Sequence, residues 1–273
     1  MPKPAVITLL SDFGLRDPYV AEMKAVIISI CPTAIIVDIS HEIKKFDIRM
    51  GAFVLAESAP YFPEGTIHVA VVDPGVGTKR RPIIIETKQS IYVGPDNGLL
   101  MLSAQREKIK HVYEIANPKY MRKDVSDTFH GRDIFSPVAA HLAKGIAASD
   151  LGPEICDPVV PGFVKPVVLN SEIEGEFIHI DDFGNLVSNI TLRDLEEIGT
   201  KKGEKIRLKL KDKDLTLRFC SAYGEVSRGM PLAIIGSGGF LEISVNQGDA
   251  SQFFNAEVGD KVLIKKYEKQ QLA

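Results

Sequence analysis

The feature of this chain that most constrains its fold is a change of pattern after about Gly152. Before that point, short apolar runs alternate with segments of helical periodicity. Val6–Leu10 has the composition of a buried parallel strand, and Tyr19–Ile30 is predicted to be a helix that begins at Asp17-Pro18. The alternation indicates an α/β sheet with helices on both faces. The other elements predicted here are strands at Ala34–Ile39, Thr66–Val72, Ile83–Glu86 and Ile91–Val93, and helices at 47–59 and 133–144.

The second half begins with a proline-rich linker and continues as short strands. Four prolines fall between residues 153 and 166. Few helical segments follow, and turns separate the apolar runs, which is typical of a small all-β barrel or sandwich. The strands are predicted at Phe177–Ile180, Ile206–Leu210, Leu215–Phe219, Leu232–Ile235, Leu241–Val245 and Lys261–Ile264. We therefore expect an α/β N-terminal domain over residues 1–165 and a β-rich C-terminal domain over residues 170–273.

Composition narrows the class of protein. The chain has 273 residues, 45% of them hydrophobic, and a formal net charge of −3. This balance gives no electrostatic reason to expect a nucleic acid or an anionic membrane as partner. No apolar run approaches the roughly 18 residues of a membrane span, and no secretory signal is visible, so a cytoplasmic location is expected. The three cysteines are far apart, and metal-ligand spacing is absent, so no metal is predicted.

Three polar turns carry the candidate chemistry of the first domain. They contain Asp12 after the first strand, Asp73 after the third, and His130 before a helix, each close to glycine. Ligands of open α/β sheets bind beyond the carboxyl ends of strands, and a carboxylate there can bind a ribose diol. Asp73 lies at the edge of an apolar strand and needs a partner, for which Arg80 and His130 are candidates. Asp12 and Asp73 are also consistent with ordinary turns or a helix cap, and His130 with a structural or exposed histidine.

The second domain offers a further polar turn, Asp181–Asn185. The Asn185 amide can pair with the edge of adenine, and Phe183 can stack on the base. A simple hairpin turn of Asp and Gly is the alternative. A glycine-rich edge from Ser237 to Gly248 flanks another predicted strand.

With these motifs in view, the chain resembles the S-adenosylmethionine (SAM) hydroxide adenosyltransferases, which are adenosyl-forming SAM hydrolases related to fluorinase and chlorinase. The resemblance implies an N-terminal α/β domain, a smaller C-terminal β domain, and a homotrimer whose ligand lies between domains of neighbouring subunits. The matching motifs follow one another in order over nearly the whole chain: Thr8–Gly14, Val72–Thr78, Gly94–Leu100, Thr128–Asp133, Asp181–Leu186 and Gly236–Ile243.

The resemblance also implies roles for single residues. Asp73, Arg80 and His130 correspond to a water-handling triad, although Arg81 is adjacent and the arginine assignment can shift by one position. Halogenating relatives carry Tyr in place of Asp73 and Tyr-Ser in place of His130-Gly131, and that serine helps to bind halide. The implied substrate-binding residues are Asp12 at the ribose, Phe46 as an aromatic lid, Asp17, Asp181 and Ser237 at the methionine, Asn185 at the adenine, and Glu242, Val245 and Ala250 near the adenine or the methionine. Gly131 and Phe183 are also expected to bind the substrate.

The expected activity is attack of water on the ribose C5′ of SAM, giving adenosine and L-methionine. SAM is then the substrate, and no cofactor is expected. Three alternatives remain open on the sequence: a 5′-halogenase, a non-catalytic binder of adenosine or SAM, and a metal-dependent hydrolase. The carboxylate and imidazole in place of halide-binding donors favour hydrolysis.

Overall fold

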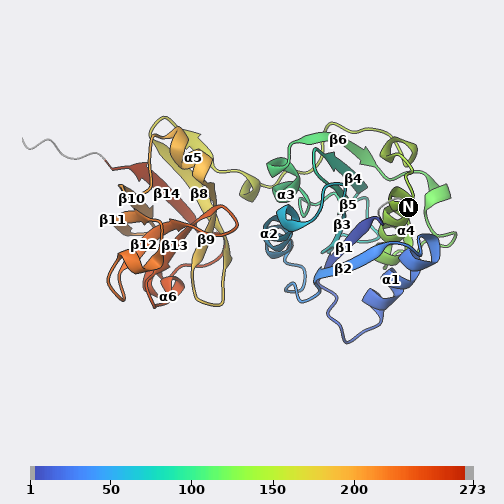
Figure 1. Ribbon diagram of the computed structural model, residues 1–273, viewed down its shortest axis with the longest axis horizontal. Helices are drawn as coiled ribbons and strands as arrows, with labels where there is room; N and C mark the ends of the chain where they lie inside the picture. The colour runs from blue at the N-terminus through green and yellow to red at the C-terminus, as the bar shows by residue number, and fades with distance from the viewer. Residues whose placement is uncertain (1–3, 268–273) are drawn as a thin grey trace, which may run out of the picture. The chain divides into compact units, whose positions relative to one another are not determined.

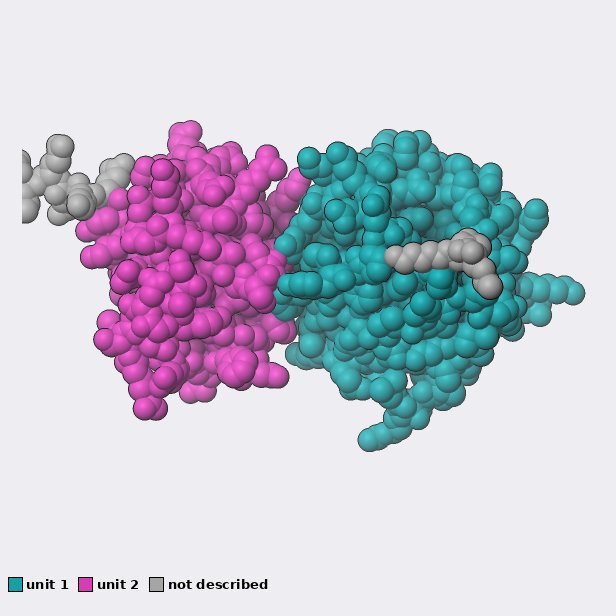
Figure 2. Space-filling model, in the orientation of Figure 1, with its two compact units in different colours: residues 1–161 teal, residues 162–273 magenta. Residues whose placement is uncertain are grey.

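The chain folds into two compact units, with the division between Pro161 and Gly162 (Figure 2). The computed structural model describes residues 4–267. The first unit is α/β and the second is a β-barrel, which confirms the fold class expected from the sequence. No helix within residues 4–267 is long and apolar enough to cross a membrane.

The first unit is built on a six-stranded sheet with the order β2-β1-β3-β5-β4-β6. Strands β1, β2, β3 and β5 are parallel, and β4 pairs antiparallel with both β5 and β6, so β6 runs in the same direction as the parallel strands. Only a tight turn separates β4 from β5, which is too short for a parallel crossover. The bounds are β1 Val6–Ser11, β2 Ile35–Ser40, β3 Ile67–Val71, β4 Pro82–Thr87, β5 Ile91–Pro95 and β6 Ile109–Glu114.

Helices cover both faces of this sheet, as predicted. Helices α1 (Tyr19–Ile30) and α4 (Ser136–Ala143) pack together against one face, where Leu9, Met23 and Ala139 belong to one buried cluster. Helices α2 (Ile48–Ser58) and α3 (Met101–Arg106) pack together on the other face (Figure 1). The short 3₁₀ turns of the chain are Ala59–Tyr61, Pro118–Tyr120, Ala148–Asp150, Gly162–Val164 and Tyr223–Glu225.

Two helix starts differ from the sequence prediction. Helix α1 begins at Tyr19 with Pro18 as its N-cap residue, so Asp17 is not the cap. The predicted helix at 133–144 is two elements, a π-helical turn at Gly131–Phe135 followed by α4. The Ser136 hydroxyl donates to the Gly131 carbonyl at 2.7 Å, which satisfies a carbonyl inside the widened turn. Such π turns often occur at functional sites.

The second unit is a closed barrel, because β8 pairs with both β9 and β14. Around the barrel the order is β14-β10-β11-β12-β13-β9-β8, and β7 is added to β8. Alternating strands such as β10, with Ile206 and Leu208 inside, fill the interior. The bounds are β7 Val167–Leu169, β8 Glu172–Ile180, β9 Leu186–Thr191, β10 Lys205–Leu210, β11 Lys213–Cys220, β12 Pro231–Ile235, β13 Phe240–Val245, β14 Lys261–Lys266, α5 Leu192–Glu197 and α6 Ala250–Phe254.

Candidate active site

Three residues from two loops form one hydrogen-bonded group at the carboxyl edge of the α/β sheet. Asp73 follows β3, Arg80 ends the glycine-rich loop after it, and His130 is the N-cap residue of the π turn. The Arg80 guanidinium binds both carboxylate oxygens of Asp73, with Nε 3.1 Å from Oδ1. Its Nη2 also lies 2.9 Å from Nδ1 of His130. The structure thus places the three residues of the expected triad together.

The neighbouring arginine has a different environment. Arg81 donates from Nε and Nη2 to the Asp96 carboxylate and from Nη1 to Asp157. Both contacts anchor the segment around Asp157, since Asp96 also accepts the backbone N–H of Val159 at 2.8 Å. Of the two adjacent arginines, Arg80 is therefore the one in contact with Asp73 and His130.

The contact with Arg80 fixes the protonation of His130. A guanidinium only donates hydrogen bonds, so Nδ1 of His130 must accept, and the proton of the neutral ring is on Nε2. Burial and the Arg80 charge lower the pKa of His130 below its ordinary 6.5, against the opposing effects of Asp73, Asp133 and Asp127. The imidazole is accordingly neutral near pH 7.

A cavity of about 360 Å³ opens over this group. Asp73 and His130 line it, whereas Arg80 lies behind them and bridges the two. Of the other residues predicted from the sequence, Asp12, Asp17, Phe46 and Gly131 also line the cavity. The residues that the sequence prediction missed are Phe13, Tyr19, Lys45, Val71, Val76, Thr128 and Phe129. Most of these are neighbours of predicted residues, so adjacency in the motifs was the available signal.

The Asp12 turn and the Phe46 turn hold each other in place. The Asp12 carboxylate accepts the backbone N–H of Phe46 at 2.9 Å, and the Lys45 ammonium donates to the Asp12 carbonyl. Phe46 has a φ of +67°, a left-handed conformation that is unusual for a bulky side chain, and the residue is 69% exposed. Strained residues of this kind cluster at ligand sites, where surrounding contacts maintain them.

A second array behind this turn joins Ser11, His41 and Asp38. The Ser11 hydroxyl lies 2.7 Å from Nδ1 of His41, and Nε2 of His41 lies 3.1 Å from the Asp38 carboxylate. The residue types are those of a hydrolytic triad, but Ser11 is completely buried and cannot reach a substrate. The His41 carbonyl also accepts the N–H of Gly14 at 2.7 Å, so the array supports the Asp12 turn.

Aromatic rings form the apolar wall of the cavity. Phe13, Tyr19 and Phe129 pack edge to face or tilted, with ring centroids 5.1 to 5.7 Å apart. The charged groups of the lining are the carboxylates of Asp12, Asp17 and Asp73 and the ammonium of Lys45. An apolar wall with a few oriented polar groups is typical of small-molecule sites.

The residues predicted in the second unit lie on turns of the barrel. The Asp181 carboxylate accepts the backbone N–H groups of Phe183 and Asn185 and the side-chain amide of Asn185, all at 2.9 Å. This fixes the turn between β8 and β9, in which Phe183 is 80% exposed. Ser237 is exposed in the turn between β12 and β13.

Three further predicted residues have less access to a ligand. The Glu242 carboxylate accepts a hydrogen bond from Tyr223 at 2.8 Å, and burial together with Asp181 raises its pKa. Val245 and Ala250 belong to the buried core of the barrel, so their side chains face inward. Only the backbone of these last two residues remains for a ligand contact.

A larger cavity, of about 680 Å³, lies on the barrel and is lined by Arg207, Asp214 and Lys265 among others. Arg207 is paired with Asp214 through two hydrogen bonds, and Lys265 is paired with Glu172. Its lining lacks the apolar wall expected for a nucleoside. Among residues 4–267, no group of three or more His, Cys, Asp or Glu side chains is arranged to hold a metal ion.

The fold and site define a class of two-domain proteins: the chain belongs to the SAM hydroxide adenosyltransferase family. Residues 7–152 match that family's N-terminal domain, and residues 175–263 match its C-terminal domain. This confirms the resemblance drawn from the six motifs.

Individual relatives show which members of this family the chain is similar to. The chain is 37% identical to an (R)-S-adenosyl-L-methionine hydrolase of Thermus thermophilus, over 94% of this chain and 98% of the relative. It is 38% identical to a protein of the same name from Methanocaldococcus jannaschii, over 95% of each chain. A fluorinase of Actinoplanes is more distant, at 30% identity over 96% of this chain and 97% of the relative. A solved structure of a conserved protein from Thermotoga maritima superimposes with a TM-score of 0.84 at 39% identity, over 95% of this chain and 100% of that one.

Proposed function

We propose that this enzyme hydrolyses S-adenosyl-L-methionine at the ribose C5′, releasing adenosine and L-methionine. One observation carries the proposal: Asp73 and His130, from separate loops, line a single cavity and share the Arg80 guanidinium behind it. A carboxylate and a neutral imidazole in that position supply an acceptor and a donor for one water molecule. Membership of the family and the hydrolase names of its relatives agree with this chemistry.

The lining of the cavity suits a cationic nucleoside. The carboxylates of Asp12, Asp17 and Asp73 favour the positive sulfonium, and the aromatic wall accommodates the sugar and the S-methyl group. We assign Asp12 to the ribose diol and Phe46 to a covering position over the ligand. The hydrogen bond between these two residues then couples the covering ring to the ribose contact.

The mechanism follows from the assigned protonation states. Water donates one hydrogen to the Asp73 carboxylate, and Nε2–H of His130 donates to the water oxygen. The oxygen forms a bond to C5′ as the C5′–S bond breaks. Methionine leaves as a neutral thioether because the sulfonium keeps the bonding electron pair, so no general acid is required at the leaving group. Asp73 takes the proton, and Arg80 stabilises its charged form between turnovers.

We also propose that the site is completed by the barrel of a neighbouring subunit in a homotrimer. All residues that line the cavity belong to the first unit, whereas Asp181, Asn185 and Ser237 belong to the second. Mixing two inactive variants, Asp73→Asn and Asn185→Ala, tests this arrangement. Mixed trimers regain activity if each site combines two subunits, and regain none if each site lies within one. Light scattering gives the subunit number.

The substrate epimer is part of the proposal. The hydrolases among the relatives are named for the (R) form of SAM, and we expect the (R)-sulfonium epimer to be the preferred substrate here. The test is incubation of purified enzyme with each epimer separately, with adenosine and methionine measured by chromatography. Equimolar adenosine and methionine, formed faster from the (R) epimer, support the proposal.

Two further arms of that experiment test the alternatives. Chloride is added to look for 5′-chloroadenosine, and a chelator is added to look for a metal requirement. Halogenated product, or loss of turnover with chelator, would assign a different chemistry. Tight binding of adenosine without release of methionine would indicate a binding protein. The cytoplasmic location expected from the sequence stays a prediction.

A further inference from the structure

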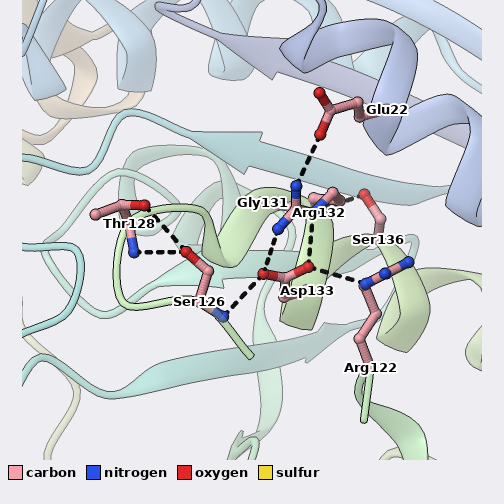
Figure 3. Close-up of polar contacts among 8 residues, drawn as sticks. All are labelled: Glu22, Arg122, Ser126, Thr128, Gly131, Arg132, Asp133 and Ser136. Carbon is pink, nitrogen blue, oxygen red and sulfur yellow. Dashed lines mark hydrogen bonds and ion pairs between the residues drawn. The ribbon is translucent and has the colours of Figure 1, made fainter. Parts of the chain in front are cut away.

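An ion network centred on one buried carboxylate surrounds the π turn that follows His130 and is not used by the mechanism above. Its centre is Asp133, whose side chain is completely buried within the π turn (Figure 3). Oδ1 of Asp133 lies 2.7 Å from Nε of Arg132 and 3.0 Å from Nε of Arg122. Oδ2 accepts from Nη2 of Arg132 at 2.9 Å and from the backbone N–H of Ser126 at 3.0 Å. Four donors thus converge on one carboxylate.

The network joins three parts of the first unit. The backbone N–H of Arg122 donates to the Asp133 carbonyl at 2.9 Å, which ties the preceding loop to the π turn. Nη1 of Arg132 donates to Glu22 of α1 at 2.9 Å, as Figure 3 shows. The Arg132 guanidinium also lies 5.1 Å from the ring centroid of Phe129, directly before His130 in the chain.

The segment held by Asp133 contacts the other catalytic loop. Ser126 begins a short run that continues through Asp127 to His130. Gly77, which lies between Asp73 and Arg80 in the chain, packs so closely on this run that a Cβ at Gly77 would lie 2.2 Å from the Asp127 carbonyl oxygen. The 126–130 segment therefore touches the Asp73–Arg80 loop at one end and ends in His130 at the other.

We infer that Asp133 is a positioning residue, which fixes segment 126–130 so that Nδ1 of His130 stays in contact with Arg80. Asparagine cannot replace it, because one oxygen becomes an NH₂ group that faces donors on either side. The kinetic readout of this inference rests on the proposed function, whereas a spectroscopic readout does not.

The kinetic test compares three variants. Asp133→Asn releases the segment from the network, whereas Gly77→Ala, at a φ of +75°, clashes with the segment and also strains the Asp73–Arg80 loop. We expect each to lower kcat by about tenfold to 10²-fold, the scale of a small misplacement, with KM changed by less than about threefold. Because both perturb the contact between segment 126–130 and the Asp73–Arg80 loop, the double variant should lose less than the product of the single losses. The matched control is Asp260→Asn, which removes a barrel carboxylate paired with Lys211 and bonded to a backbone N–H, and its kcat should stay within about twofold.

The spectroscopic test is an NMR titration of the His130 imidazole. Burial lowers the pKa of this ring most, the Arg80 charge lowers it further, and the charges of Asp73, Asp133 and Asp127 raise it. Loss of the Asp133 charge alone would lower the His130 pKa further. Loss of the Arg80 contact, which is the positioning effect, would instead raise it toward 6.5.

The outcomes separate the two proposals. A raised His130 pKa in both Asp133→Asn and Gly77→Ala, with a loss in kcat, supports the positioning role. A His130 pKa that is lowered in folded Asp133→Asn, as loss of the charge alone predicts, and unchanged in folded Gly77→Ala overturns it, whatever the turnover. Wild-type enzyme that releases no adenosine refutes the proposed function, while the titration still decides the role of Asp133.

Discussion

Replacing Asp73 by asparagine is the sharpest perturbation of the proposed site. The carboxylate receives the Arg80 guanidinium through both oxygens, so asparagine must present an NH₂ group to one of two N–H donors. The substitution therefore removes the proton acceptor and strands the Arg80 charge in one step. Its effects on activity and on stability are separable.

The expected losses of stability and of turnover can both be given a magnitude. The side chains of Asp73 and Arg80 are only 5% and 7% exposed, so the remaining guanidinium has little access to water. Breaking a buried pair by removing one partner costs about 3 to 5 kcal/mol of unfolding free energy. Loss of a proton acceptor lowers turnover by about 10² or more. The ordinary unfolding free energy of a domain is about 5 to 15 kcal/mol, so a domain above the lower end of this range remains folded after such a loss.

The assay measures adenosine release by chromatography at a temperature where circular dichroism shows the variant folded. The double variant Asp73→Asn with Arg80→Met separates the two effects, because it removes the stranded charge. We expect it to recover part of the lost stability and none of the lost turnover. Turnover of Asp73→Asn within about threefold of wild type would refute the assigned role of Asp73.

Three further predictions follow from single side chains. His130→Gln retains an N–H donor but cannot act as a base, so its turnover should be at least about tenfold higher than that of His130→Ala. Equal loss of turnover in both variants would mean that His130 takes the proton of the attacking water. Burial lowers the pKa of His68 to about 4, so the unfolded chain takes up its proton first as the pH falls below 6.5. The unfolding free energy should then fall by about 2 to 3 kcal/mol between pH 7 and pH 4.5 in urea titrations, and His68→Gln should show a smaller fall. Phe46→Gly relieves the strain of a left-handed φ and should raise the unfolding free energy by about 1 kcal/mol. The same substitution removes the covering ring and should raise KM severalfold, whereas an unchanged KM would show that Phe46 does not contact the substrate.

Much of the fold was predictable because it follows from periodic patterns. Apolar runs such as Val6–Leu10 and the helix at Tyr19–Ile30 form as expected, and Asp47 caps α2 through the N–H of Met50. The π turn at Gly131–Phe135 was not predictable, because its apolar spacing continues into α4 without interruption. Its geometry depends instead on the Ser136 hydroxyl and on tertiary ion pairs of Asp133.

The candidate site, like the fold, was predictable from the sequence only in part. Asp12, Asp73 and His130 stand out because polar residues beside glycine follow or precede regular elements, and the structure brings them to one cavity. The choice of Arg80 over Arg81 needed coordinates, since only the turn of the Gly75–Thr78 loop decides which guanidinium points toward Asp73. Chain-distant supports such as Ser11 with His41 likewise carry no local signal.

The origin of the oxygen in the product tests the central claim most directly. The enzyme is incubated with SAM in ¹⁸O-labelled water, and adenosine and methionine are analysed by mass spectrometry. Attack by one water molecule held between Asp73 and His130 predicts a single ¹⁸O in the adenosine 5′-hydroxyl and none in methionine. Adenosine without the label, or label in methionine alone, would contradict it.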